Sequence, residues 1–273
     1  MKTYTFSSFK LELLHVNGDL DYGILSYRLE DLVWFRWENC PHISIDLPEI
    51  NNLRVLELVK GNLETLFQLP AQLREVRVKK CRELVEIPPA FESLIQLEKM
   101  TLIGCVKLEI LPQQLCQLQA LKHLELRKCE SLTSLPDQFF GELTNLVHID
   151  FSDCENLSQL PRSFGQLSQL KYLELRNCRN LMIHPELFEE INSLEQLGFE
   201  NCRNLRHLPT QTTCQVFLRK LNLLGTSLEQ LPNDIDQWTK LELLYIESPF
   251  LTSLPLCLGN MRCVTQLVLF NCP

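Results

Sequence analysis

The segment Leu121–Pro136, LKHLELRKCESLTSLP, contains the pattern that decides the fold. Its first half has the form L-x-x-L-x-L-x-x-C, and its second half continues as x-x-L-x-x-L-P. In the first half, Leu124 and Leu126 alternate with Glu125 and Arg127, so the leucines point to one face and the charged residues to the other. The alternation predicts a short β-strand, and the second half predicts a turn that returns two leucines to the same interior before proline ends the strand register.

The same phrase recurs along the whole chain. Its last residue falls at twelve positions: Asp19, Cys40, Gly61, Cys81, Cys105, Cys129, Cys154, Cys178, Cys202, Thr226, Pro249 and Cys272. The first four are 20 or 21 residues apart and the later ones 23 to 25. Chance does not plausibly produce this series, and its period is that of the leucine-rich repeat.

Stacked units of this kind predict an α/β fold, a horseshoe-shaped leucine-rich-repeat solenoid formed by residues 1–273 as one domain. We expect about twelve short parallel strands on the concave side and an irregular, short-helical convex side. The outer segment 137–146, DQFFGELTNL, is expected to be loosely helical, and His184, in a leucine position, to be partly buried. The predicted strand centres are Leu14, Phe35, Leu56, Val76, Met100, Leu124, Ile149, Leu173, Leu197, Leu221, Leu244 and Leu267.

Eight repeats end their strand with a cysteine: Cys40, Cys81, Cys105, Cys129, Cys154, Cys178, Cys202 and Cys272. At this position the chain bends into the interior, beside backbone groups that need partners, and a thiol is a weak donor of suitable size. Zinc sites use pairs such as C-x-x-C, which the sequence lacks. The column is therefore predicted to be structural, with buried and reduced thiols; metal binding or redox chemistry is the alternative.

Composition and missing motifs restrict the function. The formal net charge is −8, which suits neither nucleic acid nor an anionic membrane surface. No apolar run reaches the roughly 18–20 residues of a membrane span, and the N-terminus lacks the apolar core of a signal peptide. Phosphate-binding glycine motifs, G-x-S-x-G and H-E-x-x-H are absent. We expect no enzymatic activity, no cofactor and no resident metal, and a location in the cytoplasm or nucleus.

The outward side chains of the strands are the candidate protein-binding surface. Glu125, Asp150 and Glu174 form an acidic row on adjacent strands, beside the aligned His123 and His148. A metal site from these five residues is the alternative to a polar protein-binding face. Arg77, Lys79, Lys80, Arg127, Lys128 and Arg176 are expected to flank the acidic row, and the predicted contact set also includes Trp34, Arg36, Tyr172 and Tyr245.

Three features of these repeats resemble plant intracellular immune receptors of the NLR class, which carry a nucleotide-binding domain and often a TIR domain. Leu32 to Pro48, LVWFRWENCPHISIDLP, looks like the opening repeats of that family, and Leu53 to Phe67 is similar to its next repeat. The later C-x-x-L-x-x-L-P units are similar to its standard repeats. The nucleotide switch and effector domain of the family have no counterpart here, so a fragment, a truncated product and a free-standing decoy stay open.

The resemblance implies a recognition module for plant defence that senses a pathogen effector or a host guardee, or restrains a signalling partner. The second hypothesis is a scaffold like the intracellular Ras-group repeat proteins, which hold a phosphatase or GTPase. We also expect self-association through the C-terminal end, where Val268 and Phe270 join other apolar residues of the concave face. Solenoids need polar terminal units to stay soluble.

Overall fold

The structure is a computed structural model. It describes residues 10–19, 29–41, 44–45, 50–66, 69–188, 190–208 and 216–273. Parts of the two N-terminal segments that carry the family resemblance, residues 42–43, 46–49 and 67, lie outside the described residues.

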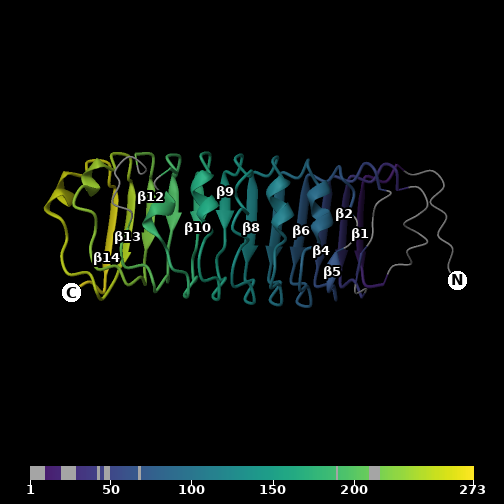
Figure 1. The fold of residues 1–273 in the computed structure, drawn as a ribbon, viewed down its shortest axis with the longest axis horizontal. Helices are drawn as coiled ribbons and strands as arrows, with labels where there is room; N and C mark the ends of the chain where they lie inside the picture. Colours follow the sequence, from purple (N-terminus) through teal and green to yellow (C-terminus); the bar gives the residue numbers. More distant parts are fainter. Residues whose placement is uncertain are drawn as a thin grey trace.

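One parallel sheet runs the length of the described chain, with its strands in chain order (Figure 1). Its twelve strands, among the described residues, are β1 (Leu13–Asn17), β2 (Trp34–Glu38), β4 (Val55–Val59), β6 (Glu75–Lys79), β7 (Lys99–Ile103), β8 (His123–Arg127), β9 (His148–Asp150), β10 (Tyr172–Glu174), β11 (Gln196–Gly198), β12 (Lys220–Leu223), β13 (Leu243–Glu247) and β14 (Gln266–Phe270).

The register of this sheet follows the repeat. Leu124 pairs with Ile149, Ile149 with Leu173, and Leu173 with Leu197. All twelve predicted strand centres lie in strands and pair with one another in this way. The predicted solenoid with a parallel sheet is therefore confirmed.

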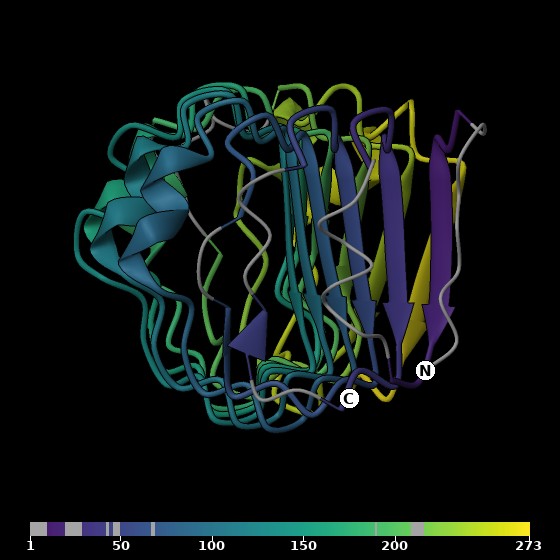
Figure 2. The ribbon, with the colours of Figure 1, turned by 90° about the vertical axis from the view of Figure 1, so that its right-hand side faces the viewer.

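Opposite the sheet, the described outer segments consist mainly of short 3₁₀ helices and irregular chain, as Figure 2 shows. The helices are η1 (Pro89–Ser93), η2 (Gln113–Gln117), η3 (Arg162–Gln166), η4 (Pro185–Phe188), η6 (Ile235–Gln237) and η7 (Leu256–Asn260). Several follow the proline that closes the repeat motif, for example η3 after Pro161. In the early repeats, β3 (Ser44–Ile45) and β5 (Thr65–Leu66) form a small second parallel sheet.

Segment 137–146 differs from the expectation, because residues 137–142 form turns without a helix. The Phe140 amide donates to the hydroxyl of Ser163 in the next repeat, at 3.2 Å, and that hydroxyl donates to the Asp137 carbonyl at 2.8 Å. The serine therefore lies between the two backbone groups that a 3₁₀ turn would join directly. Phe139 and Phe140 are both buried beneath this turn.

The core lies between the sheet and the outer segments. Leucines from the strands and turns fill most of it, and phenylalanines from the outer segments stack from repeat to repeat. The ring centroids of Phe140 and Phe164 are 5.3 Å apart, and those of Phe164 and Phe188 are 5.9 Å apart. These edge-to-face contacts add to the apolar burial that joins neighbouring repeats.

His184 is exposed, so the expectation that it is partly buried is wrong. The neighbouring Ile183 packs against the core. Burying an aliphatic side chain costs less than burying an imidazole without a hydrogen-bond partner.

Exposure rises at the C-terminal edge of the sheet. Leu267 and Leu269 occupy core-facing positions of β14 but are 43% and 41% exposed, because β14 is the edge strand of the sheet among the described residues. Leu173, which is 0% exposed, occupies the same register position as Leu267 in the middle of the sheet.

We predict that Leu173→Ala lowers the free energy of unfolding by about 2–5 kcal/mol, because it leaves a cavity in the packed interior. Leu267→Ala is the matched control, and it is expected to cost clearly less because its site is already open to water. Urea denaturation of both variants measures the difference. Equal losses would contradict the packing described here.

Candidate functional site

Two neighbouring rows of side chains cross the middle strands on the face opposite the core. His123, His148 and Tyr172 pair in register and form an aromatic row. Glu125, Asp150 and Glu174 pair in the same way and form the acidic row. All six side chains are partly exposed, so they are available to a partner.

The aromatic row is continuous. Ring centroids are 5.9 Å apart between His123 and His148, and 6.0 Å apart between His148 and Tyr172, with interplanar angles near 40°. Partial burial lowers the pKa of His123, and the neighbouring His148 and Lys99 lower it further. The neutral imidazole is thereby favoured at neutral pH.

The acidic row is neutralised unevenly. The Lys99 ammonium lies 2.8 Å from the Glu125 carboxylate, and the Arg127 guanidinium lies 3.3 Å from Asp150. Glu174 has no ion pair or hydrogen bond to another described residue. Burial raises its pKa, and the negative charges of Asp150 and Glu200 raise it further.

The basic residues predicted to flank the acidic row differ in their partners. Arg77 donates two hydrogen bonds to Glu75, at 2.7 and 2.8 Å, and Lys79 pairs with Glu57. Lys80 and Lys128 adopt φ near +57° in the turns after their strands. Arg127 contacts the row through Asp150, and Arg176 is exposed.

The other predicted contact residues lie towards the two ends of the sheet. Trp34, on β2, has a buried indole N–H without a partner among the described residues. Tyr245, on β13, donates from its hydroxyl to the Gln266 side chain at 2.9 Å. The structure therefore brings the histidines, Tyr172 and the acidic row together but leaves Trp34, Arg36 and Tyr245 outside that cluster.

Glu57 is a feature that the sequence analysis missed. Its side chain is only 3% exposed and accepts ion pairs from Arg36, at 3.1 Å, and Lys79, at 2.9 Å. Burial opposes ionisation, but the hydrogen bond from Lys79 and the charges of both bases prevail and lower the pKa of Glu57. A signal was present in the sequence: Glu57 aligns with the basic Arg36 and Arg77 on the neighbouring strands.

Residues 119–179 match the protein family described as leucine rich repeat. The chain is a leucine-rich-repeat solenoid. Solved structures share this fold. A leucine-rich-repeat protein of Leptospira interrogans superposes with a TM-score of 0.54 at 22% identity, covering 96% of this chain and 79% of that one. The leucine-rich-repeat domain of the type III effector XopL gives 0.53 at 21% identity, covering 94% and 76%.

Plant disease resistance proteins have similar leucine-rich repeats, which confirms the resemblance seen in the sequence. The Arabidopsis thaliana protein At4g19050, described as a disease resistance protein, is 32% identical over 233 residues. The Arabidopsis disease resistance protein RPP4 is 29% identical over 129 residues. These regions cover 84% and 46% of this chain but only 17% and 11% of the relatives, so the chain spans a small part of their length.

The cysteine column follows the leucine-rich repeats through the solenoid. Seven of its eight residues are buried, and Cys272 at the last strand is partly exposed. The thiols of Cys154, Cys178 and Cys202 donate to a backbone carbonyl in the preceding repeat, at 2.9, 3.1 and 3.1 Å. Burial raises the pKa to about 11 for Cys81 and to about 12 for Cys105 and Cys202.

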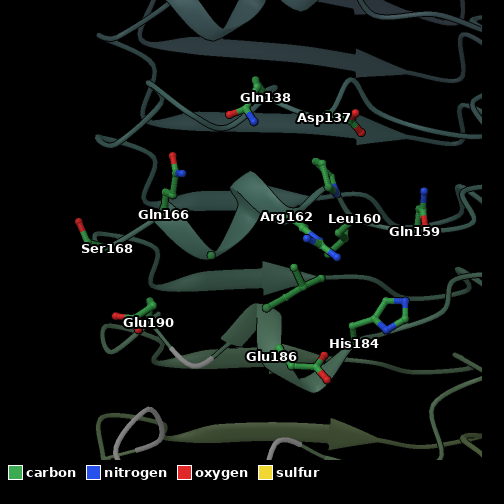
Figure 3. Close-up of a pocket in the computed structure, with 13 residues that line it drawn as sticks. Asp137, Gln138, Gln159, Leu160, Arg162, Gln166, Ser168, His184, Glu186 and Glu190 are labelled. Carbon is green, nitrogen blue, oxygen red and sulfur yellow. The ribbon is translucent and has the colours of Figure 1, made fainter.

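The outer side of the leucine-rich repeats has a groove of about 1310 Å³ between the 137–142 turn, η3 and η4. Figure 3 shows Arg162 in its middle, with Asp137 and Glu186 on opposite sides. Except for His184, none of the residues singled out from the sequence lines this groove.

Among the described residues, no group of three or more His, Cys, Asp or Glu side chains is arranged to hold a metal ion. No described helix is long and apolar enough to cross a bilayer.

We predict that the buried thiols react slowly in the folded protein. A pKa of about 11 leaves roughly one thiolate per thousand Cys81 thiols at pH 8, and burial further restricts access. Mass spectrometry after iodoacetamide treatment is expected to show labelling of the exposed Cys263 at least about 100-fold faster than of Cys81, Cys105 and Cys202. Labelling of the three buried sites is expected to become fast in denaturant. Fast native labelling would contradict the buried column.

We predict that Glu57→Gln destabilises the protein by about 1 kcal/mol at pH 7, because Arg36 and Lys79 lose the negative charge with which both form ion pairs. The pKa of Glu57 is lowered by folding, so its ionised form contributes stability above the unfolded pKa of about 4.3, and that contribution is lost as the pH falls through the folded pKa. The difference between wild type and variant should therefore shrink below about pH 4. Urea midpoints measured across this range test the prediction, and a constant difference would argue against it.

Proposed function

We propose that this chain is a protein-recognition module of the plant disease-resistance type, which binds another protein through its concave sheet and performs no catalysis of its own. The observation that carries the proposal is the arrangement of the middle strands. Two rows of polar and aromatic side chains stand on a sheet in fixed register, in a chain similar over 84% of its length to a disease resistance protein.

The sheet is suited to binding because its outward side chains are held before a partner arrives. The ordering cost of association is smaller for such a surface than for flexible loops. A protein interface of ordinary size buries about 800 Å² on each partner, which several adjacent strands can supply. Tyrosine and arginine, both present here, are among the residues most often found at binding hot spots.

The proposed contact surface is centred on β8, β9 and β10, with Trp34, Arg36, Arg77, Lys79 and Tyr245 towards its ends. The partner is a pathogen effector, a host guardee or a signalling protein, and it is met in the cytoplasm or nucleus. Residues 1–273 act as a single leucine-rich-repeat domain in this proposal. Self-association through the C-terminal end, where Val268 and Phe270 join other apolar residues of the concave face, stays a prediction of the sequence, and light scattering at high protein concentration tests it.

We predict that Tyr172→Ala combined with Glu174→Lys lowers affinity for the partner at least about tenfold, because it removes an aromatic contact and reverses a charge. Affinity purification from plant tissue identifies the partner, and titration calorimetry compares the variants. Both side chains face away from the core, so the urea midpoint is expected to change little.

Glu92→Lys is the matched control, because it makes a similar charge reversal at an exposed position in η1, on the outer side. It is expected to leave affinity unchanged. Unchanged affinity in the double variant would place the binding site elsewhere. Capture of a phosphatase or GTPase would instead favour the scaffold function.

A further inference from the structure

Gly198 opens a space in the surface of the concave sheet. It lies on β11 in register with Glu174 on β10 and Asn222 on β12, so it interrupts a row of side chains. A Cβ atom at Gly198 would collide with the Glu174 carboxylate, because Glu174 extends over the glycine into the place where the next side chain of the row would be. The collision involves one carboxylate oxygen and the carboxylate carbon, and the second oxygen would be in tight contact at 3.1 Å.

Within the described residues, the chain leaves the carboxylate in this space without a partner. Glu125 and Asp150, the other members of the acidic row, each have a cation within 3.3 Å. Arg176 and Lys220 act on Glu174 only through longer-range attraction, while Asp150 and Glu200 repel its charge. A half-buried carboxylate in this setting is unfavourable unless a donor reaches it.

We propose that the Glu174 carboxylate, which lies over Gly198, forms a subsite that binds one lysine or arginine side chain of the protein partner as an ion pair. The inference rests on the proposed function, since it names one contact within that concave surface. A cation beside this carboxylate would relieve the repulsion among Glu174, Asp150 and Glu200, which an apolar group could not do.

The aromatic row supports the same choice of ligand. Tyr172 is two residues before Glu174 on β10 and points to the same face of the sheet. A cationic side chain approaching Glu174 along the sheet passes this ring, and aromatic faces attract ammonium and guanidinium groups. Arginine and lysine ligands are both compatible with the subsite, and arginine could also form two parallel hydrogen bonds with the carboxylate.

Gly198 is then a positioning residue, since it acts through Glu174. Alanine at this position would push the carboxylate out of the space and towards solvent. The chain offers a matched control in Gly259 of η7, where an added Cβ would meet nothing within 4 Å. Glu174→Gln is the second variant, because it keeps the shape of the side chain and removes its charge.

The first measurement requires no partner. Carboxyl ¹³C resonances of the full chain are followed by NMR as the pH changes. We expect the pKa of Glu174, which is raised in the wild type, to fall back towards its ordinary value in Gly198→Ala and to stay raised in Gly259→Ala. An unchanged pKa in Gly198→Ala would show that the glycine does not position the carboxylate and would overturn the inference.

The second measurement uses butylguanidinium and butylammonium chloride as mimics of the two side chains. Either salt is expected to shift the Glu174 resonance saturably in wild type and Gly259→Ala, with at least fivefold weaker binding in Gly198→Ala. The Gly198 amide resonance serves as the probe in Glu174→Gln. The two salts are expected to shift this resonance in the wild type and to leave it unshifted in the variant. Absence of a saturable shift, or tighter saturation by calcium chloride than by either organic cation, would overturn the subsite.

Affinity measurements with the captured partner distinguish the subsite from the broader proposal that the concave face binds a protein. Gly198→Ala and Glu174→Gln are each expected to weaken partner binding, and the double variant should bind no more weakly than Glu174→Gln, because the glycine acts through that side chain. Additive losses would overturn the subsite. If both single variants bind like wild type while His148→Ala and Tyr172→Ala bind weakly, the subsite fails and the concave-face function stands.

Discussion

The structure depends on one constraint: each inward-facing residue of a strand must lie beside its counterpart in the next repeat. A single repeat cannot cover its own apolar side, so its leucines are buried only when the neighbouring coil aligns with it. A slip of one residue would turn every leucine of that strand towards solvent. The consistent pairing of Leu124, Ile149, Leu173 and Leu197 is the result of this constraint.

The same constraint organises the surface that faces away from the core. Because inward residues align, outward residues align as well, so the charges of neighbouring strands meet in rows across the sheet. In the N-terminal half, bases from adjacent strands surround the acid, as Arg36 and Lys79 do for Glu57. In the middle, Glu174 has acidic neighbours and no such pair. Among the described residues, the Glu174 charge is therefore uncompensated by an ion pair close to the aromatic row.

The outer side tolerates irregularity that the sheet does not. The Ser163 hydroxyl replaces a direct backbone contact in the turn at 137–142, yet the strands on either side stay in register. His184 is exposed in a leucine position because Ile183 packs against the core beside it. Outer segments need only fill volume and satisfy their backbone groups, whereas a strand must match two neighbours along its whole length.

The repeat, the direction of the strand residues, the strand centres and the alignment of His123 with His148 could all be predicted from the amino-acid sequence, because they follow from a period and an alternation. The charge contacts of the middle strands became visible only in the folded chain. Lys99 on β7 contacts Glu125 on the neighbouring β8 diagonally, two residues beyond its register partner His123. Glu174 extends over Gly198. These contacts join residues 26 and 24 positions apart and depend on side-chain reach and local burial, which the pattern within a single repeat does not specify.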